Sequence, residues 1–138
     1  MLIIPATELR RIREQAQREY PSQCCGLLLG VRRDGEKLAL RAEPCVNAAA
    51  DRAHGYMIAP AELIEGLRTA RERQLQILGF YHSHPDRPAN LSDLDMNCAE
   101  WTNCSYMVLS VEEGQVTVLR SFVADRQAGM LEEPLKIG

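Results

Sequence analysis

Two histidines separated by one residue, followed by a serine and an aspartate, are the residues of this chain best suited to chemistry. The stretch His-Ser-His-Pro begins at His82, and Ser-Asp-Leu-Asp begins at Ser92, with six residues between its serine and the proline. Residues i and i+2 of a strand point to one face, so His82 and His84 would present two imidazoles together. Residues three apart on a helix also share a side, so Ser92 and Asp95 would do the same.

Two imidazoles and a carboxylate around one point form a three-ligand zinc site with a fourth position left for water, which is the catalytic arrangement. We therefore predict Zn²⁺ bound by His82, His84 and Asp95. Each half has a plainer interpretation, because a His pair can be polar surface and Ser-x-x-Asp is a common helix start. Their conjunction favours the metal site. The remaining histidine of the three, His54, falls in a predicted loop and is interpreted as a surface residue.

Composition places the chain among ordinary globular proteins. It has 138 residues, a net charge of −3, 46% hydrophobic and 25% charged residues, so we predict one domain covering residues 1–138. Basic residues are scattered, which argues against a nucleic-acid or anionic membrane partner. The amino terminus is too short for a signal-peptide core, and no apolar run approaches a membrane span. We predict a cytoplasmic location.

The five cysteines follow no metal-binding pattern. Their number is odd and they contain no Cys-x-x-Cys pair, which argues against a cysteine zinc ribbon. In a reducing cytoplasm we expect them to be small buried apolar residues. The alternative is a catalytic or metal-bound role for Cys24 or Cys25. The five are Cys24, Cys25, Cys45, Cys98 and Cys104.

Apolar spacing predicts three helices that would position these residues. The first begins near residue 5, with Thr7 as a possible N-cap, and ends before Pro21. The second begins at Pro60 and runs to about residue 73, with an inner stripe formed by Leu63, Ile64 and Leu67. The third is short, begins at Ser92 and ends near residue 101.

Strands are predicted between and after these helices. Turn signals at Asp34-Gly35 and at residues 112–115 predict two hairpins. The tail after Asp125 is weakly patterned and is expected to lie on the body of the protein. The fold class is therefore predicted as mixed α/β (α+β), with a largely antiparallel central sheet flanked by helices. The predicted strands cover residues 2–4, 24–31, 37–46, 56–58, 75–82, 106–111 and 116–123.

The pattern His82-x-His84-Pro85-x6-Ser92-x-x-Asp95 resembles the signature of the JAMM (MPN-plus) zinc metallopeptidases, compact bacterial type. The segment from Pro21 to Gly30 resembles the strand that follows the first helix in that family, and the order of elements agrees over nearly the whole chain. The resemblance implies a cytidine-deaminase-like MPN fold. It also implies cleavage of an isopeptide or peptide bond after the terminal glycine of a ubiquitin-like protein, or of a sulfur carrier with a Gly-Gly tail.

The resemblance also assigns catalytic roles. Zinc would polarise the scissile carbonyl and lower the pKa of a water toward about 7, and Ser92 would donate a hydrogen bond to the developing oxyanion. A glutamate just before the Cys-Gly-Leu-Leu strand would move the water's proton. The matching residue here is Gln23, and an amide cannot take a proton at neutral pH. Loss of general acid/base catalysis lowers rates about 10²–10⁴-fold.

Two explanations of Gln23 compete: an engineered Glu-to-Gln variant, which we favour because the predicted metal ligands remain, and a naturally weak or silent member. Glu19 is a weaker candidate for a substitute base, since its register differs by about one turn. The alternative function is a zinc-containing module that binds a Gly-Gly tail without cutting it. A zinc deaminase is disfavoured because the chain lacks His-x-Glu with Pro-Cys-x-x-Cys.

A bound tail is expected to lie extended along a strand edge near the site, and the sequence leaves open which strand provides it. The oligomeric state is also left open. A homodimer through an exposed Trp101 or through the carboxy-terminal tail is one possibility.

Overall fold

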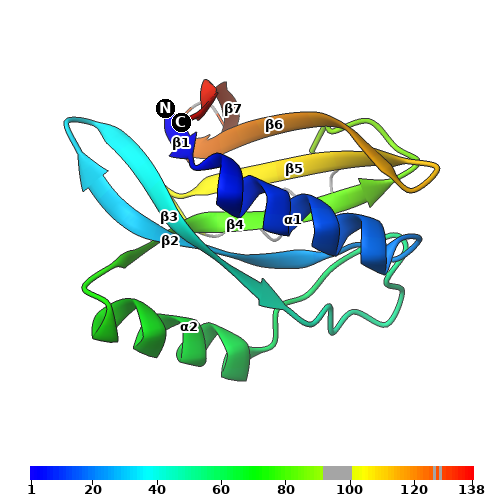
Figure 1. Cartoon of the computed structure of the whole chain (residues 1–138), viewed down its shortest axis with the longest axis horizontal. Helices are drawn as coiled ribbons and strands as arrows, with labels where there is room; N and C mark the ends of the chain where they lie inside the picture. The colour runs from blue at the N-terminus through cyan, green and yellow to red at the C-terminus, as the bar shows by residue number, and fades with distance from the viewer. Residues whose placement is uncertain (92–100, 126, 128) are drawn as a thin grey trace.

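The computed structural model describes residues 1–91, 101–125, 127 and 129–138. In this part of the chain one eight-stranded sheet, in the order β7-β6-β5-β4-β2-β3-β1-β8, lies between two helices (Figure 1). The strands are β1 (Leu2–Ile4), β2 (Cys25–Arg33), β3 (Glu36–Cys45), β4 (Gln76–Pro85), β5 (Ser105–Glu112), β6 (Gln115–Asp125), β7 (Gly129–Glu133) and β8 (Leu135–Ile137). The helices are α1 (Ala6–Glu19) and α2 (Pro60–Glu72).

The sheet is largely antiparallel, as predicted. Strand β2 pairs antiparallel with β3 and β4, and β6 pairs antiparallel with β5 and β7. Strand β1 runs parallel to β3 and β8, and β4 runs parallel to β5. The chain must therefore cross over between β4 and β5, and this crossover carries the segment that follows the two histidines.

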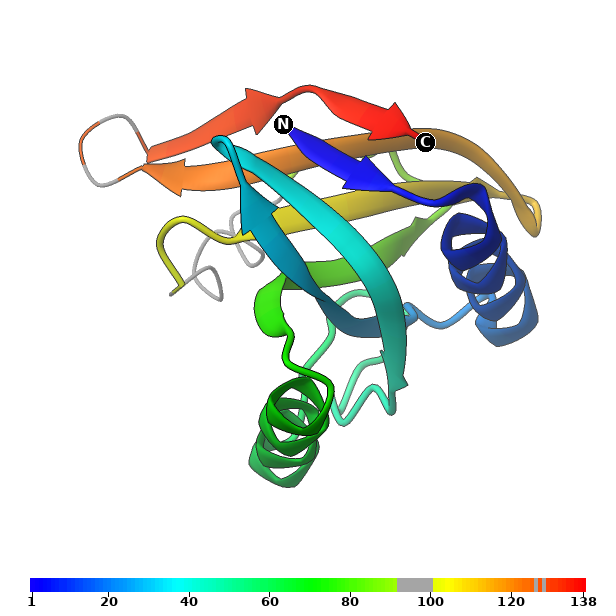
Figure 2. The same ribbon diagram turned by 60° about the vertical axis from the view of Figure 1, so that its left-hand side comes forward.

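The carboxy-terminal segment joins the two ends of the sheet. Strand β7 pairs with β6, whereas β8, just beyond Pro134, pairs with β1. The Leu2 N–H donates to the Pro134 carbonyl at 3.0 Å, and the Gly138 N–H donates to the Ile4 carbonyl at 3.0 Å. Figure 2 shows this segment running from β6 across to β1. The weakly patterned tail thus forms strands that curl the sheet on itself.

Helix α1 covers one face of the sheet. Leu9, Ile12 and Ala16 are buried at three- and four-residue spacing, and they pack in the same core cluster as Leu28 and Tyr81. Pro5 occupies the N-cap position of the helix, and no side chain makes a capping hydrogen bond there. The prediction of Thr7 as N-cap is therefore wrong. Proline at residue 21 favours an extended conformation at the residue before it, which ends the helix.

Helix α2 packs toward the opposite face through small residues. Gly66 and Ala70 are buried, whereas Ile64 is 65% exposed and Leu67 46% exposed. A Cβ on Gly66 would lie 2.2 Å from Leu27 Cδ1, so the helix backbone approaches the sheet closely. The predicted inner stripe is therefore wrong at Ile64 and Leu67. The residues of α2 that face the sheet are instead ones small enough to let the helix backbone come close to it.

Three smaller predictions have different outcomes. Residues 56–58 form no strand in the structure. Trp101 is half-buried and packs edge-on against Phe80, with ring centroids 5.5 Å apart, so its predicted exposure is wrong, whereas the homodimer stays a prediction. The predicted helix from Ser92 to about residue 101 falls almost wholly outside the described residues. Within the described ranges, no helix has the length and apolar character needed to cross a membrane.

Candidate functional site

The two predicted histidines meet at the end of β4. His82 and His84 are each 1% exposed, and their Nε2 atoms lie 3.1 Å apart. Both belong to β4 and are separated by one residue, so the pleat of the strand puts them on one face. Cys25, the residue opposite His82 on β2, packs with Ala70 of α2. The pair therefore lies on the α2 side of the sheet.

Neighbouring groups fix the orientation of both imidazoles. The Nδ1 of His84 lies 2.9 Å from the Pro88 carbonyl oxygen. Since a carbonyl only accepts, that nitrogen carries the proton and the Nε2 lone pair faces His82. The His82 ring stacks on Tyr56, with centroids 4.4 Å apart and an interplanar angle of 19°. Both side chains are thus held in place with their Nε2 atoms converging.

This geometry fits two ligands of a tetrahedral zinc ion. Zinc–nitrogen distances of about 2.0–2.1 Å place two such nitrogens about 3.3 Å apart, close to the observed 3.1 Å. No group of three or more His, Cys, Asp or Glu side chains able to hold a metal occurs among the described residues. The predicted third ligand, Asp95, and the predicted oxyanion donor, Ser92, both lie outside those residues.

Gln23 lies beside the histidines through strand pairing. Cys25 is opposite His82, and the Ser83 N–H donates to the Cys24 carbonyl at 3.1 Å. Continuing this register places Gln23 opposite His84, and directly opposite residues share a face of the sheet. Gln23 itself is fully buried. The sequence-predicted residues His82, His84 and Gln23 are therefore brought together.

The Gln23 amide is held at both ends. In the orientation that satisfies its hydrogen bonds, its nitrogen donates to the Ser83 carbonyl at 3.2 Å. Its oxygen accepts from the Gly55 N–H at 3.2 Å and from Nη2 of Arg87 at 2.5 Å. Arg87 was missed by the sequence analysis. Its only signal was its place three residues after His84, inside the motif.

Asn47 is a second residue that the sequence analysis missed. It is 4% exposed, and its Nδ2 donates to the backbone carbonyls of Gln23 at 3.1 Å and Gly55 at 2.9 Å. Its Oδ1 accepts from the Met57 N–H at 3.1 Å. These bonds fold the loop 48–57 over the site and bring Gly55 and Tyr56 to their contacts. An asparagine opening a loop is the single sequence signal of this role.

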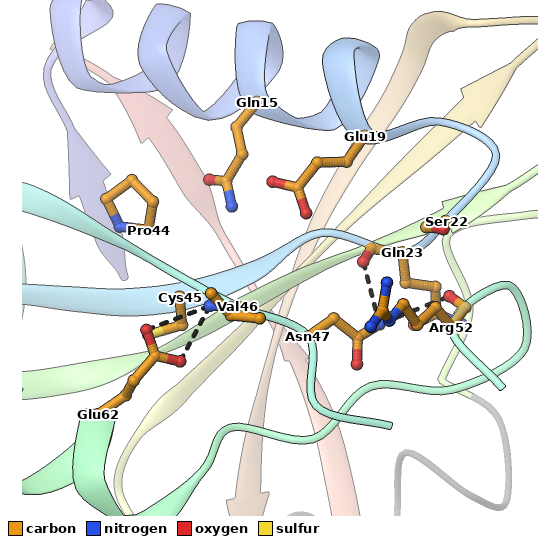
Figure 3. Close-up of a pocket in the computed structure, with 10 residues that line it drawn as sticks. All are labelled: Gln15, Glu19, Ser22, Gln23, Pro44, Cys45, Val46, Asn47, Arg52 and Glu62. Atoms are coloured by element: carbon orange, nitrogen blue, oxygen red, sulfur yellow. Dashed lines mark hydrogen bonds between the residues drawn. The ribbon is translucent and has the colours of Figure 1, made fainter. Parts of the chain in front are cut away.

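A cavity of about 390 Å³ lies on another side of Gln23. Figure 3 shows Glu19 and Gln15 entering it from α1, and Glu62 of α2 bordering it near Val46. Neither histidine lines this cavity. Glu19 therefore shares a cavity with Gln23 but approaches it from a side that the histidines do not line.

The four described cysteines are free and buried. Burial raises the pKa of both Cys24 and Cys45 to about 12, so neither is a thiolate at neutral pH. For these four the predicted role as small buried residues is confirmed, and Cys98 lies outside the described residues. His54 is a surface residue, as predicted, and its Nδ1 lies 2.9 Å from Asp51.

Comparisons with known proteins show the family of this chain. A model of prokaryotic homologues of the JAB domain matches residues 5–125. A desampylase from Haloferax volcanii is 31% identical over 110 residues, which cover 79% of this chain and 76% of the relative. A probable TtuB-protein conjugate cleaving protease from Thermus thermophilus is 32% identical over 73% of this chain and 65% of the relative.

A solved structure shows the same fold. The solution structure of a protein from Desulfitobacterium hafniense matches with a TM-score of 0.89 at 26% identity, covering 100% of this chain and 93% of that one. The JAMM/MPN resemblance is therefore confirmed, and this chain belongs to the family of prokaryotic JAB domain homologues.

Proposed function

We propose that residues 1–138 form one zinc peptidase domain that acts on the Gly-Gly tail of a ubiquitin-like or sulfur-carrier protein, with hydrolysis impaired by Gln23. The observation that carries the proposal is the convergence of the His82 and His84 Nε2 atoms at 3.1 Å, beside the buried Gln23. Similarity to a desampylase and to a TtuB-conjugate cleaving protease supports the substrate class. The free thiols are consistent with the proposed cytoplasmic location.

His82, His84 and Asp95 would bind the zinc, and Ser92 would stand beside it. The chemistry that zinc supplies when bound is activation of a water and polarisation of the scissile carbonyl. The chain prepares for this in two ways. The Pro88 carbonyl fixes the tautomer of His84, and Tyr56 fixes the ring plane of His82.

Gln23 limits the reaction at the proton transfer. It occupies the position from which the family's glutamate would take a proton from water and deliver it to the leaving amine. Its amide can orient a water through hydrogen bonds but has no basic atom at neutral pH. Slow hydrolysis is the consequence, and loss of the base does not by itself remove the site for the tail.

The glutamine at position 23 also favours a second candidate function. A domain that retains the tail site but lacks the base would capture a Gly-Gly tail without cutting it. The two functions share one surface and differ only in turnover, so they are separated by restoring the base.

The test compares the chain as it stands with Gln23→Glu and with Gln23→Glu/His84→Ala. Each protein is assayed for zinc content and for release of a carrier from fusions joined through Gly-Gly. We expect equal zinc in the first two proteins and a rate about 10²–10⁴-fold higher with glutamate. The double variant should lose both zinc and activity.

Two outcomes would reject parts of the proposal. A zinc-loaded Gln23→Glu protein that stays inert on a panel of Gly-Gly fusions but binds their tails would establish the binding module instead. Full zinc in the His84→Ala background would reject the ligand assignment.

A further inference from the structure

Arg87 is a part of the site that hydrolysis does not use. Its backbone carbonyl accepts a hydrogen bond from Ser110 Oγ at 2.5 Å, which fixes its position against β5. Its Nη2 donates to the Gln23 amide oxygen at 2.5 Å. Its buried Nε has no hydrogen-bond partner in the described part of the chain. No carboxylate there lies within the 4.0 Å of an ion pair with its guanidinium.

Among the described residues, the acidic groups near Arg87 do not supply a counter-charge. Asp86 is adjacent, but its carboxylate accepts from the Tyr20 hydroxyl at 2.5 Å and from the Glu113 N–H at 2.8 Å. Glu19 lines the cavity that Gln23 borders, and no ion pair joins it to Arg87. A partly buried cation facing a neutral amide, with one donor unused, is an unfavourable arrangement by itself. An anionic ligand that accepted from the guanidinium would supply the counter-charge that the described residues do not provide.

We propose that Arg87 and Gln23 form a subsite for the free C-terminal carboxylate of a Gly-Gly tail. This inference rests on the proposed function, since it names the form of the tail that the site retains. A guanidinium forms strong charge-assisted hydrogen bonds with a carboxylate. Gln23 is opposite His84, so a terminus bound there lies next to the position at which the scissile carbonyl would meet the histidines.

The residue at position 23 decides which ligand Arg87 takes. A glutamate there would sit in the same contact, become the partner of Arg87 and repel a second carboxylate. The glutamine leaves the charge of Arg87 available. The substitution that impairs hydrolysis therefore also favours the released, carboxylate form of the tail over an amide-linked one.

The test uses a fluorescent peptide ending in Gly-Gly, prepared with a free carboxylate and with a terminal amide. Dissociation constants are measured by anisotropy with zinc-loaded protein and again after chelator dialysis. We expect the unaltered chain to bind the carboxylate form about tenfold or more tightly in both states, as a charge-assisted bond requires. Arg87→Met should reduce this preference to within about twofold.

Two further variants separate Arg87 from general charge and from misfolding. Arg52→Met removes an equal charge at another residue beside Gln23 and should keep the preference. Gln23→Glu leaves Arg87 and its loop intact and should abolish the preference. This variant therefore tests the role of Arg87 even if Arg87→Met fails to fold.

Each contrary result has a distinct meaning. Equal binding of both peptides, a preference retained in Arg87→Met, a loss as large in Arg52→Met, or a preference that disappears with the metal would each overturn the role of Arg87. Failure of every variant to bind either peptide would instead reject the tail recognition of the proposed function.

Discussion

Glu133 joins four strands of the sheet through one buried carboxylate, and its removal should strongly lower the free energy of unfolding. The side chain is 9% exposed and accepts hydrogen bonds from Ser105 of β5 and from Ser121 of β6, the latter at 2.8 Å. The Nζ of Lys37, on β3, lies 3.0 Å away. Burial raises the pKa of Glu133, but the hydrogen bonds from the two serines and Lys37 outweigh it and hold the pKa below its usual 4.5. The folded state therefore favours the charged form.

The magnitude follows from these contacts. Opposite charges 3.0 Å apart attract by about 5 kcal/mol at an effective dielectric constant near 20. Desolvation offsets part of this, and removing one partner of a buried pair leaves the other uncompensated, at a cost of about 3–5 kcal/mol. Both side chains keep slight solvent contact, 8% for Lys37 and 9% for Glu133. We therefore expect Glu133→Gln to lower the free energy of unfolding by about 2–4 kcal/mol at pH 7.

The sign of the pH dependence is fixed by the lowered pKa. A group with a depressed folded-state pKa contributes stability that is complete above its unfolded-state pKa and is lost as the pH falls through the folded-state value. Urea unfolding followed by circular dichroism should thus show the difference between the two proteins at pH 7 and its decline below about pH 4.5. The exposed Glu132, paired with Arg120, provides a control, and Glu132→Gln should change little. A Glu133→Gln deficit that is absent at neutral pH, or that persists undiminished in acid, would refute this reasoning.

Three further predictions concern the site and its scaffold. His84→Ala should reduce bound zinc to background in dialysed protein measured by atomic absorption, whereas His54→Ala should keep it. Gly79→Ala should cost more than about 3 kcal/mol in urea unfolding, because a Cβ there would lie 2.0 Å from a backbone oxygen of β5. Gly66→Ala should cost less, since its Cβ meets only a leucine side chain. Glu19→Gln, placed in the Gln23→Glu background, should leave kcat/KM within about threefold, and a larger fall would make Glu19 a participant.

Local patterns were sufficient for most of the scaffold. The apolar run before Val31 and the Asp-Gly turn predicted β2 and its hairpin because both signals lie within a few residues. Strand β8 could not be predicted in this way. It is three residues long and its partner, β1, lies at the other end of the chain. Its formation depends on a closure of the sheet that no short window of sequence contains.

The same distinction applies to the site. The convergence of His82 and His84 follows from the two-residue period of one strand, so it could be predicted. The contacts of Asn47 and Arg87 with Gln23 span 24 and 64 positions and depend on how β2 pairs with its neighbours. Neither residue type indicates such a role, because asparagines and arginines are mostly solvent-exposed.

The edge of β3 near the site is closed to an incoming strand. The Ala42 N–H donates to the Glu8 carboxylate at 2.9 Å, and the Val46 N–H donates to the Glu62 carboxylate at 2.9 Å. Pro44, between them, has no N–H. In an edge strand, the backbone N–H groups of alternate residues point away from the sheet. Ala42, Pro44 and Val46 are the alternate residues here, and each N–H is either bonded to a carboxylate or absent.

An extended tail that needs main-chain donors therefore finds none along that half of β3, so we do not expect that edge to bind the tail. Among the described residues, the loop 48–57, which Asn47 holds over the site, also lies beside the histidines. A tail arriving there would pass Tyr56 and end near Gln23 and Arg87. Because Glu8 and Glu62 close the alternative path, we expect their replacement by glutamine to leave tail affinity unchanged, while changes in the loop alter it.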